Sequence, residues 1–375
     1  MCSASRRSCT ACASVADARE ARQAALRERL AADELDGLIV THLPNIRYLT
    51  GFTGSAGILL VLQATTILLT DFRYEAQAPA EVGGAASVEI AAADLWDRAA
   101  KLLRGDHVRT LGFEDDVATV ATVRRATQAV QGVELRPAGG RVEQLRARKS
   151  PWEVAAIREA ARLAGEAFES AVGAVRPGVT ERDVAVVLER ELRRRGSEWH
   201  PFPTIVASGP RSALPHARTG GRSIERGDLV LLDFGAQLDG YCADLTRTVV
   251  VGCADERQRA VYELVREAQQ RARDGVRAGM SGSAADALAR GLIEARGYGA
   301  AFGHSLGHGL GLEVHEEPRL GRSNGEPLPE GAVVTIEPGV YFVGWGGVRL
   351  EDDVWLTGAG AELLSDGRTE LRELP

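Results

Sequence analysis

The stretch that decides the fold is Gly227-Asp228-Leu229-Val230-Leu231-Leu232-Asp233-Phe234-Gly235, because its pattern returns as Gly331-Ala332-Val333-Val334-Thr335-Ile336-Glu337-Pro338-Gly339. At this shift of 104 residues, Asp233 falls on Glu337. A shift of 107 residues brings the next acidic residue, Asp244, onto Glu351. The second half of the chain is therefore predicted to consist of two similar units around a pseudo-twofold axis, each of which contributes two carboxylates to one site.

The first of these units has the pattern of a β-hairpin. Residues 229–250 are mostly apolar and β-branched on both sides of Asp239-Gly240, which is a typical two-residue hairpin turn. If the strands pair across this turn, Asp233 faces Thr246, and Asp244 lies two residues further along on the same side. Both carboxylates then project from one face of the sheet, within reach of a shared ion.

The second unit offers comparable geometry. Glu337 precedes Pro338, which biases the glutamate towards an extended conformation. Glu351 follows the glycine-rich segment 344–347, where the chain is expected to turn back.

Four clustered carboxylates need compensating charge. Two carboxylates ~4 Å apart repel each other by roughly 4 kcal/mol at an effective dielectric constant of about 20. Two divalent cations would cancel the four negative charges, and the chain has few lysines near these segments. The alternative is that these residues are ordinary strand and turn acids that face solvent.

A histidine cluster between the two carboxylate pairs favours the metal site. Residues 303–316 read GHSLGHGLGLEVHE and include His304, His308 and His315, three of the seven histidines of the chain. Closely spaced glycines allow backbone and imidazole rings to approach an ion or a substrate. The isolated histidines are expected to be satisfied or solvated residues without a ligand role: His42, His107 and His200.

These motifs, taken in order, closely resemble a known family. They are LLDFGA with Asp233, ADLTRT with Asp244, the histidine segment with His308, TIEPGVY with Glu337, and VRLEDD with Glu351. The order resembles the dinuclear metallopeptidases of the pita-bread fold, which include aminopeptidase P, prolidase and methionine aminopeptidase. The resemblance covers roughly residues 150–365 and implies that these five residues are the metal ligands.

The first half of the chain narrows the resemblance. Residues 45–55 (NIRYLTGFTGS) and 70–74 (TDFRY) look like the amino-terminal domain of the Xaa-Pro peptidases, which methionine aminopeptidases lack. The expected architecture is α/β, with a creatinase/prolidase-like amino-terminal α/β domain over residues 16–145 and a pita-bread catalytic domain over 150–370. Residues 1–15 are expected to be a disordered leader or an upstream start, with helix from near Asp17.

Two further local patterns support this division. Leu38-Ile39-Val40 and the segment 57–70 are predicted as strands of the first domain. Ser150-Pro151-Trp152-Glu153 has the pattern of a capping box with proline at the first helical position, so a long helix is predicted to begin there. The domain junction is therefore expected near residues 140–150.

The resemblance also implies roles in catalysis. Two metals ~3.5–4 Å apart can hold a bridging water and lower its pKa from about 15.7 towards neutrality. Glu337 is the expected general base as well as a ligand, and His315 is expected to stabilise the carbonyl oxygen of the tetrahedral intermediate. His216 and His304 are expected to position the substrate, and Arg349 to hydrogen-bond the ligands, the alternative for Arg349 being a plain strand ion pair. An oxygen-rich ligand set with one imidazole suits Mn(II), although Co(II) or Zn(II) could occupy it.

The implied reaction is hydrolysis of the peptide bond that precedes proline. The nitrogen of that bond carries no hydrogen, and the proline ring fixes the backbone. General peptidases that bind an extended chain through its backbone N–H groups therefore reject it. GFTGSAG followed by TDFRY favours an aminopeptidase P-like activity on longer Xaa-Pro peptides over its alternative, a prolidase that cleaves Xaa-Pro dipeptides. Two remote alternatives are a creatinase-like hydrolase, which lacks the complete metal set, and a binding protein that has lost catalysis.

Composition is consistent with a cytoplasmic enzyme. The protein is also expected to be a homodimer. The 375 residues carry a formal charge of −7, which argues against a nucleic-acid partner. No apolar stretch approaches the ~18–20 residues of a membrane span. The five cysteines give no disulfide framework, and Cys9-x-x-Cys12 lacks a partner pair for a zinc or redox site.

Overall fold

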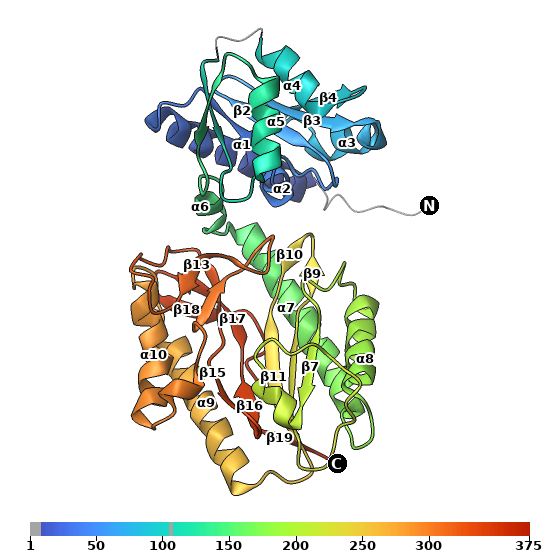
Figure 1. Cartoon of the computed structure of the whole chain (residues 1–375), viewed down its shortest axis with the longest axis vertical. Helices are drawn as coiled ribbons and strands as arrows, with labels where there is room; N and C mark the ends of the chain where they lie inside the picture. Colours follow the sequence, from blue (N-terminus) through green and yellow to red (C-terminus); the bar gives the residue numbers. More distant parts are fainter. Residues whose placement is uncertain (1–8, 105–107) are drawn as a thin grey trace. The chain divides into compact units, whose positions relative to one another are not determined.

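The computed structural model describes residues 9–104 and 108–375, which form two compact units, Met1–Arg146 (unit 1) and Ala147–Pro375 (unit 2) (Figure 1). Each unit has its own apolar core. Among the described helices, none has the length and apolar character needed to cross a lipid bilayer. His107 lies outside the described residues.

Unit 1 is a mixed sheet covered by helices. Its described strands follow the order β4-β3-β2-β1-β5-β6, with β1, β5 and β6 parallel to one another and β2 antiparallel to both of its neighbours. The strands are β1 (Gly37–Val40), β2 (Ile58–Leu62), β3 (Thr66–Asp71), β4 (Ser87–Ala91), β5 (Thr110–Phe113) and β6 (Glu134–Pro137). The helices are α1 (Cys9–Ala32), α2 (Leu43–Thr50), α3 (Gln77–Val82), α4 (Leu95–Leu103), α5 (Val120–Ala129) and α6 (Glu143–Arg146).

Two details of unit 1 differ from the sequence expectation. Helix α1 begins at Cys9 instead of near Asp17, so the later part of the expected disordered leader is helical, while residues 1–8 lie outside the described residues. No glycine or proline interrupts the alanine-rich sequence between these positions, which allows the helix to extend. The predicted strand 57–70 is two antiparallel strands, β2 and β3, because the chain turns between Leu62 and Thr66.

Unit 2 repeats one arrangement, a helix pair followed by antiparallel strands. The first half contains α7 (Pro151–Ala171), α8 (Glu181–Arg194), β7 (Ile205–Ser208), β8 (Leu229–Phe234), β9 (Gln237–Leu238), β10 (Tyr241–Cys242) and β11 (Leu245–Val251). The second half contains α9 (Glu256–Gly275), α10 (Gly282–Ala295), β12 (Gly307–Gly309), β13 (Glu316–Leu320), β14 (Val333–Ile336), β15 (Gly339–Phe342), β16 (Gly346–Arg349), β17 (Asp352–Thr357) and β18 (Gly360–Leu363). The final strand, β19 (Arg372–Leu374), returns to pair with β11.

The strands of unit 2 lie between the two helix pairs (Figure 1). Helices α7 and α8 pack on β8 and β11 through residues such as Leu188 and Leu232. Helices α9 and α10 pack on β14 and β17 through residues such as Val265 and Val334. The strand ends that carry Asp233, Asp244, Glu337 and Glu351 line one cavity, as the sequence repeat predicts.

Three local predictions for unit 2 are confirmed. Helix α7 begins at Pro151 with Ser150 as its N-cap, and the Ser150–Glu153 capping box is formed. Asp239 and Gly240 have φ of 49° and 78°, so both adopt the left-handed conformation that a two-residue hairpin turn requires. The resulting register places Asp233 opposite Thr246.

Candidate metal centre

The four repeated acids come from corresponding positions of the two halves. Asp233 lies near the end of β8, and Asp244 immediately precedes β11, the strand that pairs with it. Glu337 immediately follows β14, and Glu351 immediately precedes β17, which pairs with β14. Each antiparallel pair therefore presents two carboxylates at the same end, one at each strand terminus.

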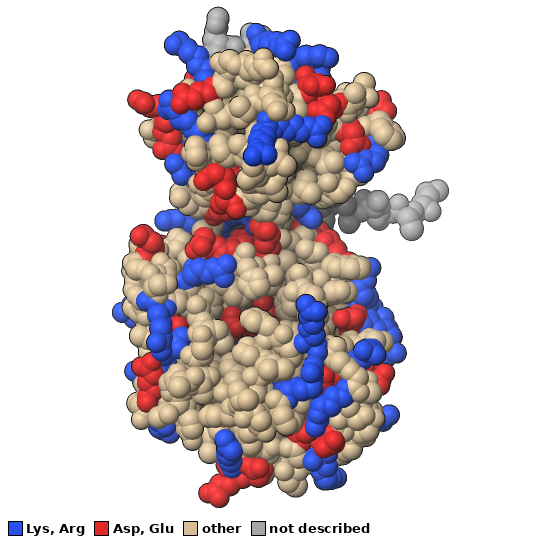
Figure 2. Space-filling model, in the orientation of Figure 1, with Lys and Arg blue, Asp and Glu red and all other residues tan. Residues whose placement is uncertain are grey.

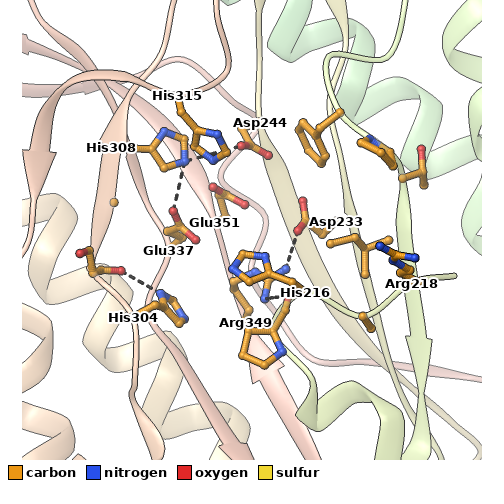
Figure 3. Close-up of a pocket in the computed structure, with 18 of the residues that line it drawn as sticks. His216, Arg218, Asp233, Asp244, His304, His308, His315, Glu337, Arg349 and Glu351 are labelled. Atoms are coloured by element: carbon orange, nitrogen blue, oxygen red, sulfur yellow. Dashed lines mark hydrogen bonds and ion pairs between the residues drawn. The ribbon is translucent and has the colours of Figure 1, made fainter. Parts of the chain in front are cut away.

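All nine residues predicted for the site line one cavity of unit 2, with a volume of about 840 Å³ (Figure 3). They are Asp233, Asp244, His308, Glu337, Glu351, His216, His304, His315 and Arg349. Figure 2 shows acidic side chains at the bottom of a hollow on this unit. Of the histidines expected to have no ligand role, His200 stacks on Trp199 at 4.6 Å, and His42 belongs to unit 1.

The donor atoms converge in the centre of the cavity. One ligand atom each from Asp244, His308 and Glu351 lie within 4.8 Å of one another, and all three side chains are buried. The Nε2 atom of His308 is 3.3 Å from a carboxylate oxygen of Glu337 and 3.8 Å from one of Asp244. This spacing is suitable for coordination of a metal ion by oxygen and nitrogen ligands.

Polar neighbours orient these donors, and the sequence alone did not identify them. The Thr246 hydroxyl donates to Glu351 at 2.6 Å, and the Thr335 hydroxyl donates to Glu337 at 3.2 Å. The Nδ1 atom of His308 lies 3.0 Å from the Gly309 carbonyl oxygen, so Nδ1 donates to that oxygen and Nε2 faces the cavity. The only sequence signal for Thr246 was its predicted position opposite Asp233.

Arg349 contacts the acidic cluster directly. Its guanidinium is 4% exposed and donates to Asp233 at 2.5 Å, to the Thr246 hydroxyl at 3.2 Å and to the Tyr341 hydroxyl at 2.8 Å. The Tyr341 hydroxyl also lies 2.9 Å from His304 Nε2. Tyr341, which the sequence reasoning missed, thus joins the predicted substrate-side histidine to the predicted arginine.

Asp353 is a further buried acid behind the cluster. Its side chain is fully buried, and one of its oxygens accepts the Asp244 backbone N–H at 3.1 Å. Of the acids after Arg349, Glu351 enters the cavity, as the sequence repeat predicted, and Asp353 does not line it.

The electrostatics of the cluster call for a cation. Burial, followed by repulsion from neighbouring carboxylates, raises the pKa of Asp244 and of Glu351 well above the usual range. Burial also acts on Glu337, but the hydrogen bond and charge of His308 outweigh it and lower the pKa of Glu337 to about 2. Loss of solvent and the adjacent His308 lower the pKa of His315 to about 4.

The residues present fit divalent metal ions. Arg349 supplies one positive charge against four carboxylates, and within the described chain the buried Asp244 Oδ1 has no hydrogen-bond partner. A buried carboxylate oxygen without a partner is costly unless a cation completes its surroundings.

Comparison with known proteins identifies the family. Residues 155–358 match metallopeptidase family M24, and residues 22–148 match the creatinase/prolidase N-terminal domain. The chain belongs to metallopeptidase family M24. It is therefore an enzyme, and its family chemistry implies divalent metal ions. The predicted resemblance and the predicted architecture, a creatinase-like domain followed by a pita-bread domain, are confirmed.

Individual M24 relatives resemble the chain over nearly its full length. A Xaa-Pro dipeptidase of Pyrococcus horikoshii is 36% identical over 341 residues, which cover 90% of this chain and 95% of the relative. The structure of a Xaa-Pro dipeptidase from Bacillus anthracis is 40% identical, covers 95% of this chain and 100% of that one, and superposes with a TM-score of 0.92. An X-Pro aminopeptidase from Thermotoga maritima is 36% identical, covers 94% and 99% of the two chains, and has a TM-score of 0.87.

Proposed function

We propose that Asp233, Asp244, His308, Glu337 and Glu351 hold two divalent metal ions. The observation that supports this most strongly is the buried convergence of Asp244, His308 and Glu351. The donor set contains four carboxylates and one imidazole, and these predominantly hard ligands favour Mn(II) over softer ions. Metal analysis after reconstitution with Mn(II), Co(II) or Zn(II) tests both the number of ions and the preference.

We further propose that the reaction is hydrolysis of the peptide bond before proline. When bound, two divalent ions would lower the pKa of a water molecule towards neutrality. Glu337, which lines the cavity beside His308, is the general base and accepts a proton at its carboxylate. His315 is uncharged at neutral pH and donates its single ring N–H to the substrate carbonyl oxygen as negative charge develops there.

The remaining histidines orient the substrate. His304 and His216 line the cavity beside the acidic cluster, and Tyr341 fixes the His304 ring through its hydroxyl. The buried guanidinium of Arg349 in turn donates a hydrogen bond to the Tyr341 hydroxyl, and so fixes the position of Tyr341. The peptide nitrogen of proline carries no hydrogen, so the cavity needs no acceptor for a backbone N–H at that position of the substrate.

Dipeptides are the favoured substrates. The P. horikoshii and B. anthracis relatives are both described as Xaa-Pro dipeptidases, so prolidase activity is better supported than the aminopeptidase P-like activity that the sequence favoured. Arg218 and Arg319 also line the cavity, and either guanidinium would attract the free carboxylate of a dipeptide. The T. maritima relative keeps the aminopeptidase as the second candidate.

The deciding experiment uses three peptides with the Mn-loaded enzyme. Cleavage of Xaa-Pro with little cleavage of Xaa-Pro-Xaa supports the dipeptidase, and efficient cleavage of Xaa-Pro-Xaa supports the aminopeptidase. Equal cleavage of Xaa-Ala-Xaa would remove proline from the proposed function. The expected homodimer and cytoplasmic location remain predictions, which sedimentation and cell fractionation would test.

A further inference from the structure

A buried lysine stands at the start of unit 2. The chain contains 45 lysines and arginines, of which Lys101 and Lys149 are the two lysines. The side chain of Lys149 is 1% exposed, whereas the adjacent Arg148 is exposed. Its ammonium lies 3.2 Å from a carboxylate oxygen of Glu316, whose side chain is 6% exposed. An ion pair this well buried loses most of its hydration, so its net contribution to stability is small, although removing one partner alone is costly.

The carboxylate of Glu316 fills the inside of the loop between β12 and β13. Its second oxygen accepts the backbone N–H of Glu313 at 3.0 Å. A Cβ atom at Gly311 would lie 2.8 and 2.9 Å from the two carboxylate oxygens, so a larger residue there would displace the carboxylate from this position. His315, the residue immediately before Glu316, ends this loop, and its ring centroid is 4.4 Å from that of His308.

The backbone around Lys149 is held by hydrogen bonds at the start of α7. Its own backbone N–H donates to the Gly331 carbonyl oxygen at 2.9 Å. The next residue, Ser150, caps α7 and donates its N–H to Glu153 at 2.9 Å. Glu153 is held in turn by the Tyr241 hydroxyl at 2.9 Å. The loop is tied to the same region from the other side, because the Cys242 N–H donates to the Gly311 carbonyl oxygen at 2.7 Å.

We propose that Lys149 and Glu316 are positioning residues, whose ion pair holds loop 310–316 against the start of α7 and thereby fixes His315 in the cavity. This inference rests on the role proposed above for His315. A compact ammonium suits the enclosed space beside the loop, whereas the larger planar guanidinium of arginine would displace it. This accounts for a lysine in a chain that uses arginine almost everywhere else.

Two variants test the pair. Glu316→Gln keeps an acceptor for the Glu313 N–H but removes the negative charge opposite Lys149. The double variant Lys149→Met/Glu316→Gln removes both charges at nearly constant volume, which avoids an unpaired buried ion. Lys101→Met is the matched control, because Lys101 is exposed on α4. We expect kcat to fall by about 10–100-fold in both test variants, since a misplacement of ~1 Å can cost about 100-fold, with unchanged metal content and a smaller change in KM.

A double-mutant cycle separates positioning from general stabilisation. If the pair acts through His315, His315→Ala costs much less activity in the Lys149→Met/Glu316→Gln background than in the wild type. If the pair only stabilises the fold, the loss on His315→Ala is the same in both backgrounds, which would overturn the proposal.

Hydrogen exchange gives a readout that does not depend on activity. The amides of residues 311–316 are expected to exchange several-fold faster in both test variants and at the wild-type rate in Lys101→Met. Unchanged exchange in this loop, with the pair removed, would also overturn the proposal. A wild-type enzyme that fails on every Xaa-Pro peptide would instead refute the proposed function, and the exchange result would still decide whether the pair holds the loop.

Discussion

His308 and His315 lie side by side in the cavity, yet their surroundings give them different tasks. His308 is buried, with Nε2 directed at the acids and Nδ1 held by a backbone carbonyl. His315 is exposed at the cavity wall. We therefore expect His315→Ala to lower turnover by ~10²–10³ while metal content stays intact, since that is the typical cost of one lost oxyanion donor.

His308→Ala provides the contrast, because it should fail to load metal in the first place. Metal analysis and turnover on the same protein samples measure both effects. Near-normal turnover of His315→Ala would show that the role given to His315 is wrong.

The raised carboxylate pKa values make a prediction about pH. Because the pKa values of Asp244 and Glu351 are raised in the metal-free fold, that fold binds more protons than the unfolded chain above the usual carboxylate pKa of about 4. Their contribution to stability is therefore lost as pH rises through the raised pKa values. Metal binding removes this penalty, so the stabilisation on adding Mn(II), and with it the increase in Tm, should grow from pH 5.5 to pH 8. Each unit of pKa shift corresponds to about 1.4 kcal/mol of that stabilisation.

Thermal melts of loaded and chelated protein across this pH range measure the difference. An increment in Tm that stays constant or shrinks as pH rises would contradict the electrostatic account of the cluster.

At the scale of elements, strand β17 links the two halves of unit 2. Its first residue, Asp352, is fully buried and accepts hydrogen bonds from Arg247 on β11 at 2.8 Å and from Arg273 on α9 at 3.0 Å. Arg247 also donates to the backbone carbonyl of Glu351 at 2.6 Å. The same arginine therefore holds together the strand pair of the first half and a carboxylate strand of the second.

Asp352→Asn should consequently lower the free energy of unfolding by about 3–5 kcal/mol, because it leaves Arg247 buried with its main partner uncharged. Asp366→Asn is the matched control. Asp366 contacts the same arginine at 2.9 Å but is 29% exposed, so its loss should cost about 1 kcal/mol or less. Chemical denaturation of both variants measures the two values, and equal losses would contradict the role assigned to burial.

At the scale of the whole molecule, metal removal should act on one unit. All donors of the proposed centre belong to unit 2, and each unit has its own core. Ligand linkage gives about 2.7 kcal/mol of stabilisation at a metal concentration 100 times Kd. We expect chelation to lower the Tm of the transition that reports on unit 2 and to speed amide exchange in β8, β11 and β14.

Peptides of unit 1 serve as the internal control for the exchange measurement. Binding of fewer than one ion per chain after reconstitution, together with an unchanged Tm on chelation, would refute the metal centre.

The sequence by itself determined those features of the fold and the site that depend on residue type and spacing along the chain. The repeat predicted paired acids from two similar halves, the Asp239-Gly240 turn predicted the register of Asp233, and the capping box predicted the start of α7. These features depend on neighbours in the chain, so residue type and spacing are sufficient to predict them.

Only the tertiary structure decided which other side chains reach the site. Tyr341 and Thr335 contact the predicted residues through the sheet geometry, and Lys149 meets Glu316 across 167 positions of sequence. The sequence selected Glu351 as a ligand but gave no role to Asp353, whose buried carboxylate accepts the Asp244 backbone N–H. Convergence of distant side chains is a property of the packed fold, since no local pattern records which residues will become neighbours.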